Sequence, residues 1–508
     1  MSEKLRPGAL ACVVLLALTR PAAAEVTPAD VWQNLLDYVG ALGSTPNYRI
    51  EEAPGHLAVR DMVVAYDLPF GFGFTVSLDT LDFRAEPEGR VSVQYPETAT
   101  LAVRGALPGG DAFTTLWTLA QQDLRILASG VPDDVRYDWS AQALTLTYEG
   151  APTGGTDDMA DVTVRVTEPG GSVQLSVSEQ IALQGDVAMG RHFLDYAYNS
   201  ADWTVYGTSF SQWDAGTLKF SAVLPRDGMD LMNLAQAFRN GLSLEVEGQH
   251  SNYRTEDQEH YDGLTTSYSA REALQINEMV ANADVLFVAL GSEASAMTQI
   301  SEPSDGFPFD LTVDSYTFRA TLPWLQKDTP QDIALAATVR NLVPRDSMWD
   351  EFDPQGLLYR APMSFDLDLG GSVINRLDWL DFDEVERTMG TGQVPLEPVE
   401  IALDALEISA LGASVSGQGS ARFDGFDWQG LTDAPPMEGT LNLRLRGLNA
   451  ALDGLVDVGL LTDGQSSAAR LGLGLLARAD ESGGPDSLVS DLEVTPDGQI
   501  RANGLRIK

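Results

Sequence analysis

The sequence predicts a mainly β fold: elongated, curved antiparallel sheets with β-bulges, two related halves and about four helices. From about residue 48 to residue 224, apolar and polar residues alternate in short runs, as they do in strands with one buried face. Turn-forming Gly, Pro and Asp residues separate many of these runs. Because helical stripes are few, we expect the apolar faces to pack against another sheet or to line a cavity.

A strand pattern that occurs twice adds the prediction of bulges. Residues 71–85 and 306–320 both alternate at period two and then change phase by one residue. That slip would turn every later apolar side chain to the wrong face, unless the strand absorbs an extra residue. A β-bulge absorbs it and bends the strand. A weaker third copy lies at 400–410, so the expected bulges are at Asp79-Thr80, Asp314-Ser315 and Asp404-Ala405.

A second pair of similar segments supports an internal duplication. GTLKFSAVL at 216–224 precedes one predicted helix, and GTLNLRLRGL at 439–448 precedes another. Both pairs of similar segments occur in the same order along the chain. The expected parts are a signal peptide at 1–24, an N-terminal β-rich half with a capping helix at 25–241, and a C-terminal β-rich half with a terminal helix pair at 242–508.

The first helix is the most clearly marked. Thr27-Pro28-Ala29-Asp30 is a capping box with proline at the first helical position, and Gly43 marks the stop. The apolar stripe between them contains Val31, Trp32, Leu35, Leu36, Val39 and Leu42. Its polar face has no lysine or arginine, unlike membrane-surface helices, so we expect it to cover one end of a sheet. Further helices are predicted at 229–240, 449–461 and 466–479, with a short turn at 346–352.

The first 24 residues predict export to the periplasm by a cleavable signal peptide. Lys4 and Arg6 precede a short apolar run, and Ala22-Ala23-Ala24 is a small-residue cleavage site. The run is shorter than the ~20 residues that a membrane-spanning helix needs. Cys12, the only cysteine, lies inside it, so disulfides and thiolate metal sites are not expected in the exported chain.

The charge balance excludes one class of partner. The chain has 32 basic and 74 acidic residues, a formal net charge of −42. Such a balance repels nucleic acid and anionic lipid headgroups at long range. We therefore expect no nucleic-acid partner, and we interpret the acidic residues mainly as a solubilising surface.

No motif in the sequence predicts a reaction. Nucleophile-elbow, phosphate-loop and H-E-x-x-H patterns are absent, and the four histidines are scattered, so we predict no catalytic residue, cofactor or metal. One enzymatic alternative is a pair of carboxylates flanking a scissile glycosidic bond, with a tryptophan as a sugar platform. The candidates are Asp381, Asp383, Glu384 and Glu386 near Trp379, and Asp424 and Asp427 beside Trp428.

The segment 346–373 resembles the signature of an exported bacterial family, the domain-of-unknown-function family 2125. The matching residues are Trp349, Phe352, Asp353, Pro354, Leu358, Arg360 and Pro362, whereas Tyr359 stands where proline is usual. EVTPADVWQNLLDY near the start and DGQIRANG near the end also resemble that family. The resemblance implies no catalytic residue. We interpret the motif as a structural corner in which prolines set turns, Trp349 packs and Arg360 pairs with a nearby acid.

The C-terminal arrangement is also similar, more weakly, to AsmA-like envelope proteins. It has repeated strands, a Leu/Gly-rich helix pair and a D-G-x-I-x-x-N-G hairpin. This similarity implies long sheets curved around an apolar groove that holds or moves lipids. The leading hypothesis is therefore a non-enzymatic periplasmic cell-envelope protein that binds a lipid, another apolar ligand or an envelope protein.

Two alternatives stay open: a packed β-sandwich that binds a protein partner, and a carbohydrate-active hydrolase. The sheet interior distinguishes the first of them from the lipid hypothesis. An open groove lined by apolar residues such as Phe72, Phe74, Phe307 and Phe309 would favour lipid. Close packing of these four residues would favour the sandwich.

Overall fold

The computed structural model describes residues 25–68, 71–106, 112–150, 159–200, 204–302, 309–389, 395–425 and 437–508. Within these residues the chain forms six helices and 28 strands. The helices are α1 (Pro28–Ala41), α2 (Leu234–Arg239), α3 (Asp346–Phe352), α4 (Phe382–Met389), α5 (Leu448–Asp457) and α6 (Asp463–Leu476). The predicted mainly β fold is confirmed.

The strands of the first half are β1 (Asn47–Ala53), β2 (His56–Asp67), β3 (Gly73–Glu86), β4 (Arg90–Gln94), β5 (Thr98–Ala106), β6 (Ala112–Gln122), β7 (Arg125–Val131), β8 (Asp134–Ser140), β9 (Ala143–Gly150), β10 (Met159–Thr167), β11 (Gly170–Val177), β12 (Gln180–Met189), β13 (His192–Asn199), β14 (Val205–Trp213) and β15 (Ala215–Pro225). Those of the second half are β16 (Ser243–Tyr261), β17 (Leu264–Ala281), β18 (Leu286–Glu302), β19 (Phe309–Leu322), β20 (Gln331–Pro344), β21 (Met363–Asn375), β22 (Leu396–Ala410), β23 (Ala413–Phe423), β24 (Met437–Arg446), β25 (Arg478–Ala479), β26 (Ser487–Val494), β27 (Ile500–Ala502) and β28 (Leu505–Arg506).

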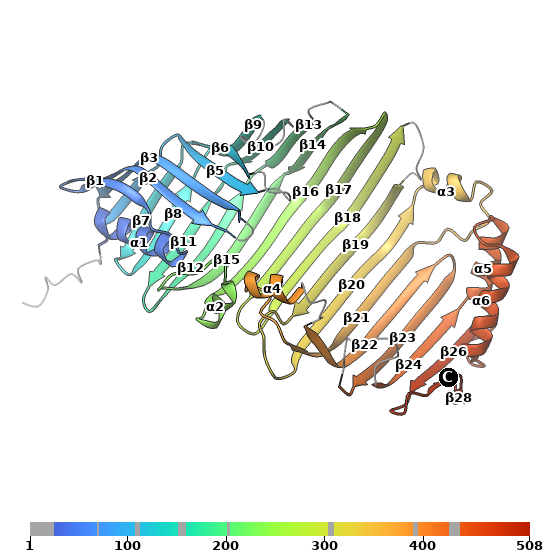
Figure 1. Cartoon of the computed structure of the whole chain (residues 1–508). Coiled ribbons are helices and arrows are strands. Elements are labelled where there is room, and N and C mark those ends of the chain that lie inside the picture. The colour runs from blue at the N-terminus through green and yellow to red at the C-terminus, as the bar shows by residue number, and fades with distance from the viewer. Residues whose placement is uncertain are drawn as a thin grey trace, which may run out of the picture.

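All of these strands belong to one antiparallel sheet (Figure 1). From β16 to β24 the sheet is a meander in which strands that follow each other in the chain pair with each other. From β4 to β15, each full-length strand is divided in two, so that β6 and β7 together face β9 and β8. The sheet also crosses the predicted boundary at residue 241, because β15 pairs with β16. The duplication stays a prediction, although β15 and β24, which contain the two similar segments, are each followed by a helix.

A line of irregular positions, which we call the crease, crosses the sheet from β1 to β21. It runs through the gaps that divide β4 from β5 and β14 from β15, and through the middle of β16 to β20. Several of its residues have left-handed backbone conformations, with φ of 51° at Asp61, 52° at Asn252, 52° at Ala294 and 51° at Asn341. Because irregular positions of this kind bend strands, the crease divides each strand into two differently directed halves.

The structure confirms irregularity at all three predicted bulge positions, but in two forms. At Asp404 the register with β21 shifts by one residue, as a bulge requires. At Asp79 the ladder with β2 skips one residue in each strand and resumes at the same offset, so Met62 still pairs with Leu78. Asp314 skips in the same way opposite Ala294 in β18. Neighbouring strands therefore carry matched extra residues, which keeps the apolar faces aligned across the sheet.

The first helix forms as predicted and lies in the core. The Thr27 side chain accepts from the amide of Asp30, whose carboxylate accepts from the amide of Thr27. Val31 and Trp32 are buried in a cluster that includes Val59 and Phe83 of β2 and β3. The Trp32 ring lies 4.9 Å from that of Tyr48, edge to face. The helix therefore covers the N-terminal end of the sheet.

The other helices differ in part from the prediction. Only Leu234–Arg239 of the segment 229–240 is helical, because Asn233 caps the helix by accepting from the amide of Gln236. The helix pair near the C-terminus is confirmed at Leu448–Asp457 and Asp463–Leu476, and α3 matches the predicted short turn. α4 was not predicted. Within the described residues, no helix has the length and apolar character needed to cross a membrane.

Candidate functional site

One face of the sheet presents an unbroken row of uncharged, mostly apolar residues from strand to strand. Each residue of the row pairs with the next across a ladder, and strands lie about 4.8 Å apart, so the row is roughly 75 Å long. The row contains Val91, Ala128, Tyr137, Val173, Gly185, Phe220, Val246, Met279, Val288, Ala320, Leu335, Leu369, Leu403, Gly419, Leu441, Leu492 and Ala502. We call the face that carries it the apolar face.

A second row runs beside the first, nearer the crease. In the C-terminal half it passes through Leu290, Phe318, Ala337, Leu367, Leu406, Gly417 and Leu443. The opposite face of the same strands is polar: in β24 the exposed residues are Glu438, Thr440, Asn442, Arg444 and Arg446. The alternation confirms that the sheet has one apolar side.

Much of the apolar face is accessible to solvent. Four of its large side chains in β18, β19 and β22 are more than a third exposed: Leu290 at 45%, Phe318 at 40%, Leu322 at 48% and Ile408 at 38%. In Figure 1 the helices lie at the margins of the sheet, and β17 to β24 have no second layer of strands over them. Scattered single apolar residues on a surface are normal, but a contiguous apolar patch marks an interaction site.

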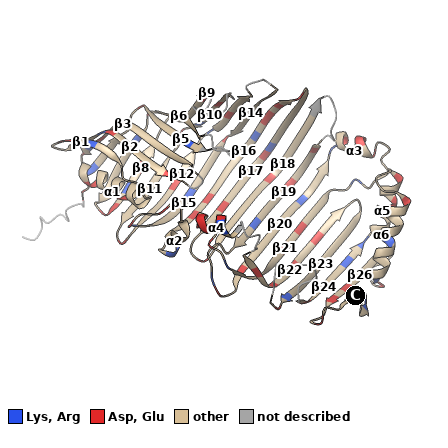
Figure 2. Cartoon of the chain, in the orientation of Figure 1, with Lys and Arg blue, Asp and Glu red and all other residues tan. Residues whose placement is uncertain are grey.

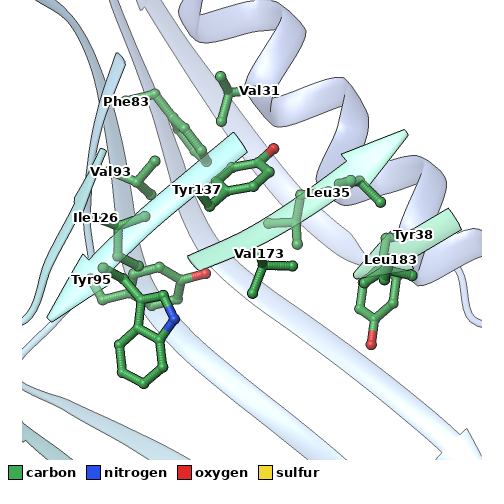
Figure 3. Close-up of a pocket in the computed structure, with 12 residues that line it drawn as sticks. Val31, Leu35, Tyr38, Phe83, Val93, Tyr95, Ile126, Tyr137, Val173 and Leu183 are labelled. Atoms are coloured by element: carbon green, nitrogen blue, oxygen red, sulfur yellow. The ribbon is translucent and has the colours of Figure 1, made fainter. Parts of the chain in front are cut away.

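At the N-terminal end, α1 closes the apolar face over a cavity of about 300 Å³ (Figure 3). Val31, Leu35 and Tyr38 of the helix line one side, opposite Tyr137 and Val173 of the sheet. Burial raises the pKa of Tyr137 to about 12. The cavity lining is almost wholly apolar, and Val173 belongs to the long row. The cavity therefore lies on the same face of the sheet as the open part.

The ends of β16 to β18 that lie lowest in Figure 1 are covered by α2 and the segments beside α4. Phe238 of α2 packs against Trp324, with ring centroids 4.4 Å apart. Ala281 and Leu325 are buried in the same cluster, with Leu380 packed against it. Arg239 of α2 donates to Asp378 at 2.5 Å, which ties the helix to the loop before α4. The open part of the apolar face thus lies between this cover and the crease.

The four phenylalanines predicted to line the interior do not form one cluster. Phe72 is exposed, with its ring 6.2 Å from that of Phe113, and Phe74 stacks on Tyr66 at 4.8 Å. Phe309 is exposed at the start of β19, beside Gln299. Phe307 lies outside the described residues. Since β3 and β19 are far apart in the sheet, Phe74 and Phe309 are not neighbours.

The motif at 349–362 forms a tight corner. Buried Asp353 accepts hydrogen bonds from the amides of Leu357 at 2.7 Å and Leu358 at 3.0 Å, and pairs with Arg360 at 3.3 Å. The Arg360 guanidinium lies 5.1 Å from the Trp349 ring, whose Nε1 donates to the carbonyl of Pro344. Trp349 is buried, Phe352 packs on it at 5.0 Å, and Pro354 and Pro362 are exposed.

The carboxylates of the hydrolase alternative lie at a helix start. Asp381 accepts from the amide of Glu384 at 3.0 Å and from the Asn233 side chain at 2.7 Å, as an N-cap residue does. Asp383, Glu384 and Glu386 follow within α4. The Trp379 Nε1 donates to Asn375 at 3.2 Å. Asp424 is exposed, whereas Asp427 and Trp428 lie outside the described residues.

The two histidines that are close in the structure are not the two that are close in the sequence. His192 and His250, on β13 and β16, contact each other at 3.1 Å, whereas His260 bonds to Thr265. Burial and the neighbouring His192 lower the pKa of His250. In the part of the chain that the structure describes, no three His, Cys, Asp or Glu residues gather as a metal ion would require.

Charged residues are interspersed along the sheet rather than gathered in one patch. Figure 2 shows acidic and basic positions scattered along β16 to β24, with long uncharged stretches between them. Comparison with known proteins adds no assignment: no family model, no curated protein and no solved structure matches this chain.

Proposed function

We propose that this is a non-enzymatic, periplasmic cell-envelope protein that binds lipid acyl chains along its apolar face. The observation that supports the proposal is the open part of that face, where large side chains such as Leu290 and Phe318 are half exposed in a contiguous surface. The signal-peptide pattern of residues 1–24 supports export, and the similarity to AsmA-like proteins supports a place in the envelope.

The energetics favour a flexible hydrocarbon over a polar ligand. Transfer of each methylene from water to an apolar surface contributes about 0.8 kcal/mol when it is fully buried. A chain that buries half of each of ten methylenes therefore gains about 4 kcal/mol before losses of chain entropy. Lipids with two chains gain more for the same single loss of translational freedom.

The length of the apolar face suggests more than one lipid for each protein chain. The hydrocarbon core of a bilayer is about 30 Å thick, so an acyl chain in one leaflet spans about 15 Å. A row of roughly 75 Å is several times longer. The cavity under α1 holds about 300 Å³, room for a single chain end, so most bound lipid would lie on the open part.

Purification of the mature protein from the cell envelope tests the proposal. We expect organic extracts to contain diacyl lipids, at more than one lipid per chain by quantitative mass spectrometry. A packed β-sandwich protein of similar size, purified alongside, serves as the control. The proposal fails if no lipid exceeds the control and if a fluorescent fatty-acyl probe does not bind the purified protein. A partner protein would then be the expected cover of the apolar face.

A further inference from the structure

A polar network interrupts the apolar face where it meets the crease. We call it the crease network; it contains Trp213, Glu272, Gln275, Ser292, Ser295 and Tyr316, from β14, β17, β18 and β19. Trp213 Nε1 donates to Gln275 Oε1 at 2.7 Å, and Gln275 Nε2 donates to Glu272 Oε2 at 3.0 Å. The Tyr316 hydroxyl donates to Glu272 Oε1 at 3.2 Å. The carboxylate of Glu272 is therefore the acceptor at the centre of the network.

Glu272 is an unusual residue for this position. It is 7% exposed, yet both of its side-chain hydrogen bonds come from neutral donors, and it has no ion pair within the described residues. Acidic side chains are seldom buried unless a cation or several donors compensate for lost hydration. A carboxylate has about four acceptor positions, and two are used here. The carboxylate can therefore accept further hydrogen bonds.

Aromatic rings stand beside this carboxylate. Tyr253 pairs directly with Glu272 across β16 and β17, and its ring centroid lies 4.9 Å from that of Trp213. Aromatic faces attract cations, and most strongly an ammonium that has been partly desolvated. The Trp213 ring is itself stacked by His192 at 5.0 Å, so Tyr253 is the ring that can face a cation. A carboxylate that can accept further hydrogen bonds next to this ring is a suitable environment for a primary ammonium group.

The crease network adjoins the apolar rows directly. Tyr316 and Phe318 are two residues apart on β19 and share a face, and Phe318 belongs to the second row. Tyr316 also pairs with Val339, which pairs with Phe365. The row of residues that contains Tyr316 is therefore apolar from the next strand onward. A molecule with its polar end at Glu272 would thus place an attached hydrocarbon chain on Phe318 and its neighbours.

We infer that the crease network binds the polar head of an amphiphile and that this head carries a primary ammonium group. The inference rests on the proposed function, since the chain of the same molecule lies on the apolar face. The ammonium donates to Glu272 and packs against Tyr253, while Trp213, on which His192 stacks at 5.0 Å, holds Gln275 and Tyr253 in place. The head is thereby fixed at the crease, and the chain extends over β18 and β19.

Competition with a fluorescent fatty-acyl probe tests the inference on the mature protein. Dodecylamine and dodecanol have the same chain but differ in the head. We expect dodecylamine to displace the probe at about tenfold lower concentration, the factor that 1.4 kcal/mol of preference produces. Glu272→Gln keeps the acceptor for Tyr316 and should remove most of the preference. Glu293→Gln is the matched control, since Glu293 is exposed at the crease on the opposite face.

The outcomes separate the two proposals. A protein that binds the probe but shows equal displacement by the amine and the alcohol overturns the ammonium site and leaves the lipid proposal standing. An equal loss of preference in Glu293→Gln also overturns it, because general attraction to an acidic protein would then explain the preference. Failure to bind the probe at all overturns both. If Glu272→Gln does not fold, the wild-type comparison and Tyr253→Leu, which should lower the preference, decide instead.

Discussion

The Asn341 side chain donates a hydrogen bond to Asp314 at 2.7 Å, which joins β20 to β19 within the crease. Asn341 has a left-handed backbone, with φ of 51°, and it lies where the register between β20 and β21 shifts. Asparagine tolerates this conformation better than most residues because its short polar side chain can bond locally. The hydrogen bond between Asn341 and Asp314 therefore stabilises the left-handed backbone at the position where the sheet bends.

Two substitutions at exposed positions of the crease should change the free energy of unfolding in opposite directions. Asn341→Ala should lower the free energy of unfolding by about 1–2 kcal/mol, because alanine is strained at positive φ and the bond to Asp314 is lost. Ala294→Gly should raise the free energy of unfolding by about 0.5–1 kcal/mol. Position 294 has a φ of 52°, and glycine adopts this left-handed conformation without the strain that alanine has there. Chemical denaturation measures both. A destabilised Ala294→Gly protein would show that β18 is a regular strand there.

The first helix should contribute strongly to stability. Trp32 is 3% exposed and packs against Tyr48 and Phe83, so Trp32→Ala should cost about 3–5 kcal/mol. Gln33→Ala, at the exposed neighbouring position, should change stability by less than about 1 kcal/mol. Thermal and denaturant unfolding compare the two. Equal melting temperatures would place the apolar stripe of α1 on the surface.

The corner at Asp353 should be sensitive to pH. Burial raises the pKa of Asp353, but bonds from the amides of Leu357 and Leu358 and from Arg360 outweigh it, so the pKa lies below its usual value. The ionised group therefore stabilises the fold above the unfolded pKa of about 4, and this contribution is lost as pH falls through the lower folded value.

Asp353→Asn should consequently lower the melting temperature at pH 7, and the difference from wild type should shrink below about pH 4. Asp350→Asn changes an exposed carboxylate of α3 and should have little effect at either pH. Scanning calorimetry across pH 3–7 provides the comparison. A difference that grows in acid would mean that the carboxylate is not the stabilising form.

The crease was only half visible in the sequence. The phase changes at Asp79 and Asp314 were recognised because both follow long alternating runs. The matching phase change in β2, where Leu57 and Val59 precede Met62 and Val64, is a signal of the same kind. The two changes together indicate that neighbouring strands slip together.

α4 has a local start signal, since its N-cap Asp381 accepts from the amide of Glu384, but the bond of Asp381 to Asn233, 148 residues away along the chain, depends on the tertiary fold.

Polar substitutions on the open part of the apolar face should weaken lipid binding without unfolding the protein. Leu290 and Phe318 pair across β18 and β19, and both are already half exposed. The double substitution Leu290→Ser and Phe318→Ser removes apolar area worth about 1–2 kcal/mol, so affinity for a fatty-acyl probe should fall about tenfold. Ile300→Ser removes an exposed residue of β18 from the opposite face and serves as the control.

The apolar face itself could be anticipated only in part. The alternation predicted one apolar side for each strand, and the scarcity of helices predicted incomplete cover. Strand order and register were not encoded in any single segment, so the row that joins Val91 to Ala502 could not be assembled. The crease network was equally hidden, because Trp213, Glu272 and Tyr316 come together only through the pairing of β14 to β19.

The most direct measurement is site-specific photocrosslinking in cells that produce the protein. A photoreactive amino acid replaces Phe318 on the apolar face or Ile300 on the opposite face, and crosslinked lipid is detected by mass spectrometry of the purified protein. We predict lipid adducts at position 318 and none above background at position 300. Adducts to a protein at position 318, or equal lipid labelling at both positions, would contradict the account.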